Sequence, residues 1–63
     1  MGIYRNIQTA CKEKGITIMG LEDKLKFGRG SIYKWDEHMP SVIKVKMVAD
    51  ELGTTVDELI KEE

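Results

Sequence analysis

The sequence contains one cysteine, one histidine and one proline, and the first two of these low counts exclude whole classes of site. A single cysteine, Cys11, cannot form an internal disulfide, and with His38 it cannot supply the four ligands of a structural zinc site. No apolar run approaches the roughly 20 residues that a membrane span needs, and no basic-then-apolar signal pattern opens the chain. We therefore expect a cytoplasmic protein that binds neither metal nor membrane.

The groups that enzymes assemble for catalysis are also missing. At 63 residues the chain has room for a single domain, residues 1–63, with one small core. No paired carboxylates, no cysteine and histidine on one helix face and no phosphate-cradling loop are visible. We expect no enzymatic activity, no cofactor and no small-molecule substrate.

Charge is present but unevenly distributed. Residues 24–34 carry four basic residues and no acid, whereas residues 50–63 carry six acids and one lysine, in a chain of net charge −1. A basic segment that includes an aromatic residue, Tyr33, is typical of a nucleic-acid contact. The alternative is an ordinary solvated face, and placement on a helix beside a turn favours the nucleic-acid interpretation.

Apolar spacing and capping residues predict the first two helices. Residues 3–14 repeat apolar side chains at helical spacing, and Gly15 follows as the residue that ends the helix. Thr17 caps a second helix that ends near Lys26. We expect Cys11 to be a small core residue and Phe27 to fill the gap before the third helix.

The third predicted helix, residues 28–37, has two faces. Ile32 and Trp35 lie three residues apart and form a narrow buried stripe. Pro40 ends this pattern, because the residue before a proline is pushed out of the helical region. The outward face carries Arg29, Ser31, Tyr33 and Lys34.

Two further helices complete an all-α prediction. Ser41 caps a fourth helix that ends at Gly53, and the motif Thr55-x-x-Glu58 opens a fifth over residues 56–61. Residues 62 and 63 are expected to fray, and no alternating run predicts a strand. The expected core positions of the fourth helix are Val42 or Ile43, Val45, Val48, Ala49 and Leu52, with Met47 filling gaps.

Four segments carry a family resemblance in their order and spacing. They are SIYKWD at residues 31–36, the Pro40-Ser41 opening, VKMVADELG at residues 45–53 and TTVDELI at residues 54–60. Together they resemble the lambda-repressor-like family, the XRE or Cro/repressor type of helix-turn-helix, over nearly the whole chain. The resemblance implies a compact five-helix domain with the helix-turn-helix at helices two and three.

The resemblance also implies a function: sequence-specific binding of double-stranded DNA by a phage- or mobile-element-type transcriptional regulator, such as a repressor. In the family the third helix enters the major groove. Arg29 is the strongest candidate for base reading, because a guanidinium pairs bidentately with guanine. The positions that the resemblance assigns to base edges are Arg29, Gly30, Ser31, Tyr33 and Lys34. Those assigned to phosphates are Thr17, Ile18, Lys26, Gly28, His38 and Lys44.

Four residues depart from the family pattern, among them Gly28, which takes the place of the usual serine cap. Ile18 stands where most members carry glutamine, and Glu22 replaces a small residue that faces the third helix. Lys26 takes the place of the turn glycine, where a positive φ would cost on the order of 1 kcal/mol.

One such domain contacts little DNA, so a homodimer is expected, with Val56, Leu59 and Ile60 as its candidate interface. The alternative for these three residues is that they close the core under the first helix. A rival function is a protein-interaction module, an anti-repressor or regulatory partner, that uses the same face without specific DNA binding. Ile18 and the acidic residues 50–63 favour that rival.

Overall fold

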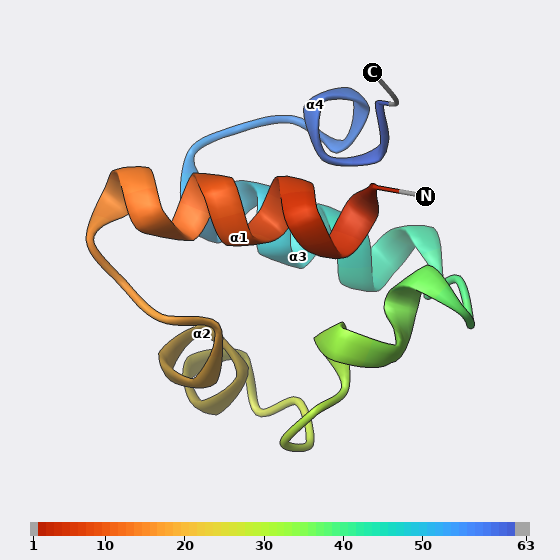
Figure 1. Cartoon of the computed structure of the whole chain (residues 1–63), viewed down its shortest axis with the longest axis horizontal. Coiled ribbons are helices and arrows are strands. Elements are labelled where there is room, and N and C mark those ends of the chain that lie inside the picture. The colour runs from red at the N-terminus through yellow and green to blue at the C-terminus, as the bar shows by residue number, and fades with distance from the viewer. Residues whose placement is uncertain (1, 62–63) are drawn as a thin grey trace.

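The computed structural model describes residues 2–61, and these form helices and connecting loops without a strand (Figure 1). The α-helices are α1 (Ile3–Lys14), α2 (Ile18–Leu25), α3 (Val42–Leu52) and α4 (Val56–Ile60). A 3₁₀-helix, η1 (Ile32–Asp36), lies between α2 and α3. The all-α prediction is confirmed, while the expected fraying of residues 62 and 63 lies outside the described residues.

α1 is the central element, because it contacts every other helix. Its buried residues Ile3, Ile7 and Cys11 recur every four positions and line one face. Gly15 ends the helix with a φ of 77°, and its N–H donates to the carbonyls of the last turn. Both predicted bounds of this helix are confirmed.

The start of α2 shows why a glycine lies within this helix. The Thr17 hydroxyl accepts the N–H of Gly20 at 2.9 Å, as the predicted cap requires. A Cβ on Gly20 would lie only 3.1 Å from that hydroxyl oxygen. At the other end of α2, Lys26 adopts a φ of 62°, so its backbone has the left-handed conformation expected at this turn.

The predicted α-helix over residues 28–37 is wrong. Only η1 forms there, five residues long and with 3₁₀ geometry. The physical reason lies at its expected start, where Gly30 takes a φ of 82° and leaves the right-handed region. At the other end, the Lys34 carbonyl accepts the N–H groups of both Glu37 and His38, which closes the segment before Pro40.

α3 has the predicted bounds and four of its predicted core residues, while three other predictions for its core fail. The Ser41 hydroxyl accepts the N–H of Lys44 at 3.3 Å, and Gly53 ends the helix in the left-handed region. Val42 and Ile43 are 73% and 74% exposed and Met47 is exposed, so their expected core roles are wrong. The residues that face the core are Val45, Val48, Ala49 and Leu52, as predicted, whereas Val42 and Ile43 lie in the first turn of α3 outside the buried cluster.

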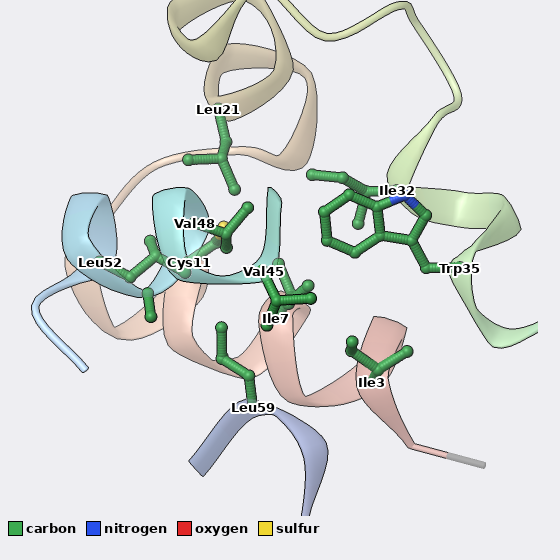
Figure 2. Packing of buried hydrophobic residues seen from close by; sticks show 11 residues of the cluster. Ile3, Ile7, Cys11, Leu21, Ile32, Trp35, Val45, Val48, Leu52 and Leu59 are labelled. Carbon is green, nitrogen blue, oxygen red and sulfur yellow. The ribbon is translucent and has the colours of Figure 1, made fainter. Parts of the chain in front are cut away.

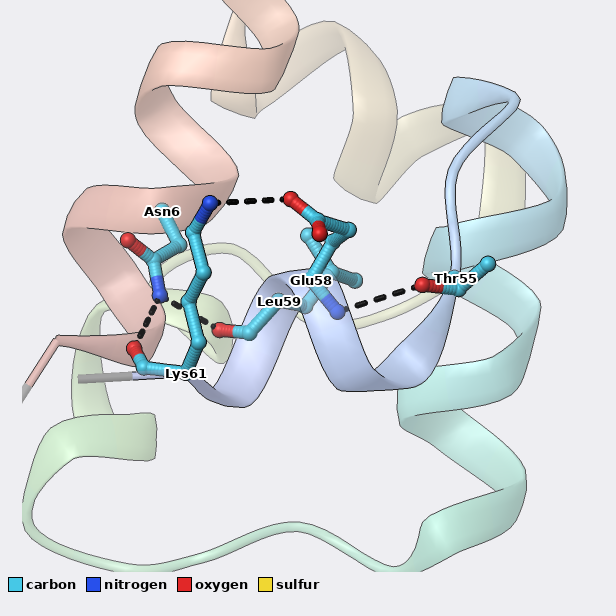
Figure 3. Close-up of polar contacts among 5 residues, drawn as sticks. All are labelled: Asn6, Thr55, Glu58, Leu59 and Lys61. Atoms are coloured by element: carbon cyan, nitrogen blue, oxygen red, sulfur yellow. Dashed lines mark hydrogen bonds and ion pairs between the residues drawn. The ribbon is translucent and has the colours of Figure 1, made fainter.

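α4 is held against α1 by side-chain contacts drawn in Figure 3. The Asn6 amide of α1 donates to the carbonyls of Leu59 and Lys61, each at 2.8 Å. At the start of α4, the Thr55 hydroxyl caps the helix by accepting the N–H of Glu58 at 3.2 Å. Leu59 is 1% exposed and lies beside Ile7 (Figure 2). Its assignment to a dimer interface is therefore wrong, since it closes the core under α1.

The core joins all five elements around the predicted pair on η1. Ile32 is fully buried, and Trp35 lies beside it next to α3 (Figure 2). The ring of Phe27 packs 5.9 Å from that of Trp35, measured between centroids, so it fills the gap between α2 and η1 as predicted. Cys11 is buried in the same core, and this burial raises the pKa of its thiol.

Candidate nucleic-acid interface

The loop between α2 and η1 is fixed from inside by a buried carboxylate. Glu22 is 1% exposed, and its two oxygens accept the N–H of Gly30 at 3.2 Å and of Ile32 at 3.1 Å. A buried carboxylate is stable only when such donors satisfy it. Glu22 therefore ties α2 to η1, a role that the sequence interpretation missed.

Arg29 extends over the outer surface of α2. One guanidinium nitrogen lies 3.5 Å from a carboxylate oxygen of Asp23, and the other lies 3.5 Å from the sulfur of Met19. Both side chains of the ion pair are more than half exposed, and such pairs contribute only about 0.2–1 kcal/mol. Arg29 is thus solvent-facing and held by a weak contact that a stronger anion can displace.

Tyr33 and Lys34 point away from the core because their neighbours Ile32 and Trp35 are buried within it. Tyr33 is 68% exposed, and its ring meets that of Tyr4 edge-on at 5.3 Å. Lys34 is exposed and forms no ion pair with any residue from 2 to 61. Together with Arg29 they form an outward cationic and aromatic face, hereafter the η1 face.

The remaining predicted base-reading residues lie at the edge of this face. Gly30 and Ser31 are half-buried, and the neighbouring Gly28, predicted to contact phosphate, is exposed. The Gly30 N–H is already bound by Glu22, and the Ser31 N–H donates to the Gly28 carbonyl at 3.1 Å. Backbone donors at these two positions are therefore occupied within the protein, whereas the Ser31 hydroxyl forms no hydrogen bond within residues 2–61.

The residues predicted to contact phosphates lie on several elements. Thr17 is exposed at the start of α2, Ile18 is half-buried against the core, and Lys26 is exposed at the end of that helix. His38 is exposed after η1. Lys44 is exposed on α3, with its ammonium 5.9 Å from the centroid of the Phe27 ring, a favourable cation–π distance.

One member of the basic segment does not belong to the η1 face. Lys24 forms an ion pair of 2.7 Å with Glu51, which connects α2 to α3. Its charge is therefore matched by an acid from residues 50–63. The cations left around the loop are Lys26, Arg29 and Lys34.

Residues 2–61 contain neither a metal-binding cluster nor a membrane-spanning helix. No three side chains of histidine, cysteine, aspartate or glutamate in this range gather closely enough to hold a metal ion. None of the described helices has both the length and the apolar character needed to cross a membrane.

No protein-family model, curated protein or solved structure matches this chain.

Proposed function

We propose that this protein is a sequence-specific, double-stranded DNA-binding transcriptional regulator of phage or mobile-element type. In this proposal α2, the loop and η1 act as the helix-turn-helix of a lambda-repressor-like domain. The observation that carries it is the η1 face, in which Arg29, Tyr33 and Lys34 project outward while Ile32 and Trp35 hold η1 in the core.

The η1 face suits the major groove by its chemistry. A guanidinium that leaves the weak Asp23 contact can pair with both acceptors of a guanine, which discriminates bases by about 1–3 kcal/mol. Tyr33 and the Ser31 hydroxyl donate to base edges or phosphates, and Lys34 supplies charge. Because η1 has only five residues, we propose that the loop residues before it contact the bases together with η1.

Thr17, Lys26, His38 and Lys44 provide phosphate contacts around this face. Such contacts fix the register of the protein on the duplex without reading sequence. We propose a homodimer on a two-fold operator with half-sites about 34 Å apart. Val56 and the exposed Ile60 are the candidate interface residues that remain after Leu59 is assigned to the core.

Selection from a pool of random duplexes at low salt tests this proposal. The expected result is enrichment of a short motif, repeated with two-fold symmetry if the protein binds as a dimer. Recovery of an unenriched pool would contradict sequence-specific binding. The same selection yields the half-site sequence and its symmetry together.

A second candidate is the protein-interaction module that uses the same face. The observation that favours it is Met19, which is 51% exposed beside Arg29 and gives the face an apolar component. Salt separates the two functions. Phosphate contacts make affinity fall steeply with added salt, whereas an apolar protein interface changes little.

A further inference from the structure

A groove separates the middle of α1 from the start of α2. It is open to solvent and encloses about 470 Å³. Arg5, Gln8 and Lys12 lie along its α1 side at spacings of three and four residues, so they share one stripe of that helix. Thr17 and Ile18 form its α2 side.

The charge of the groove is entirely positive. Cys11 lies at its base as a small, buried side chain, and no acid in the described part of the chain lines it. Neither Arg5 nor Lys12 forms an ion pair with any residue from 2 to 61. Two unpaired cations around a hollow that also offers an amide and a hydroxyl favour an anionic ligand.

The size and shape of the groove narrow the class of anion. A hollow of about 470 Å³ that is open along one side is larger than a single phosphate ion requires. It suits a length of sugar-phosphate chain, whose phosphates are bound in proteins by arginine, lysine, glutamine and threonine side chains. All four residue types line this groove.

The groove adjoins the η1 face. Ile18 lines the groove, and the next residue, Met19, lies with its sulfur 3.5 Å from the guanidinium of Arg29. Ile18 and Met19 are consecutive residues in the first turn of α2, so the groove and Arg29 lie on neighbouring sides of that turn, about 100° apart around the helix axis. A nucleic-acid strand that meets Arg29 can therefore continue into the groove.

We propose that the groove between α1 and α2 holds the sugar-phosphate backbone of duplex DNA, with Arg5 and Lys12 as its positioning cations. This inference rests on the proposed DNA-binding function and adds two residues on α1 that the sequence interpretation did not assign. Both residues neutralise phosphates and neither reads bases. They therefore set affinity and register rather than sequence preference.

The test compares two double variants with the same change of charge. Arg5→Ala with Lys12→Ala empties the groove of cations, and Lys46→Ala with Lys61→Ala removes two cations outside it, on α3 and just after α4. The dissociation constant of each full-length protein is measured by fluorescence anisotropy over a series of KCl concentrations. The probes are the duplex enriched by selection and a scrambled duplex.

The groove variant is expected to bind both duplexes more weakly by the same factor, leaving the ratio between them unchanged. Its slope of log affinity against log salt should decrease by about 2, close to 0.9 for each lost phosphate contact. The control variant should change the slope by less than half as much. Gln8→Glu, which places an acid in the groove, should weaken both duplexes and provides a second variant if the first does not fold.

The outcomes separate this inference from the function on which it rests. If the unaltered protein binds no duplex, the proposed function fails. If it binds and the groove variant or Gln8→Glu leaves affinity and slope unchanged, the groove proposal is overturned and the function stands. Equal losses in the groove and control variants would also overturn it, because net charge alone would explain them.

Discussion

The carboxylate of Glu22 accepts the backbone N–H of Ile32 at 3.1 Å, with both side chains buried. The other oxygen of Glu22 accepts the N–H of Gly30, so one side chain on α2 holds the backbone on both sides of Ser31. Arg29 is the residue before Gly30, and Ser31 lies between Gly30 and Ile32. The exposed positions of the η1 face are thus set by a contact inside the protein.

Replacing Glu22 tests how much of the fold depends on this contact. Each hydrogen bond to a charged group contributes about 1.5–3 kcal/mol, and its loss leaves a buried N–H without a partner. Glu22→Ala should lower the free energy of unfolding by about 2–4 kcal/mol in urea denaturation. Glu22→Gln, which keeps one carbonyl acceptor and the side-chain volume, should have a smaller effect. A loss below about 0.5 kcal/mol for the alanine variant would refute this role.

Lys26 lies in the left-handed region, where a side chain costs about 1–2 kcal/mol. Lys26→Gly removes that strain but adds about 0.5–1 kcal/mol of freedom to the unfolded chain. The net expectation is a gain in stability of up to about 1 kcal/mol, together with weaker binding to every duplex. Lys26→Ala is the control, since it should lose the same binding without the gain in stability. A glycine variant that unfolds more easily than the wild-type protein would contradict the argument.

The sequence alone predicts most of the fold, because caps and apolar spacing act locally. Thr17, Ser41 and Thr55 each cap the next helix through their own hydroxyl, and Gly15 and Gly53 end helices in the left-handed region. Each of these capping residues forms its hydrogen bond with a backbone group no more than four residues away in the sequence. The bounds of α1 and α3 follow directly from them.

What the sequence did not predict depends on contacts between distant residues. Glu22 meets a backbone N–H ten positions later, and Lys24 pairs with Glu51 across two helices. Neither contact has a local signature, so the sequence did not predict that Glu22 would hold the backbone at Gly30 and Ile32 or that Lys24 would be paired with an acid. The α3 core was also ambiguous, because the apolar residues Val42 and Ile43 are adjacent and spacing alone does not exclude either.

Arg29 and Lys26 should affect DNA binding in different ways. Arg29→Ala should flatten the base preference at one position of the selected motif, by about 1–3 kcal/mol, because the bidentate contact is lost. Lys26→Ala should weaken all sequences alike, as expected for a phosphate contact. Repeating the selection with each variant measures both effects. Uniform losses of the same size from both substitutions would remove Arg29 from base reading.

Leu59 and Ile60 are adjacent on α4 but differ in environment, one 1% and the other 43% exposed. Leu59→Ala should lower the free energy of unfolding by about 2–5 kcal/mol, because it leaves a cavity under α1. Ile60→Ala should change it by less than about 0.5 kcal/mol. Sedimentation equilibrium of the Ile60→Ala variant then tests whether this residue takes part in self-association. Only a lower dimer fraction than in the unaltered protein supports an interface at Ile60. Similar losses of stability from both substitutions would contradict the assigned burial.

The central claim is that the η1 face is the surface that meets DNA. Titration of ¹⁵N-labelled protein with the selected duplex, followed by amide chemical shifts, tests it most directly. The largest shifts are expected at residues 29–34, with smaller ones at residues 17–18 and 26. Shifts concentrated on the exposed side of α3, around Val42 and Ile43, or no shifts at saturating duplex, would contradict the account.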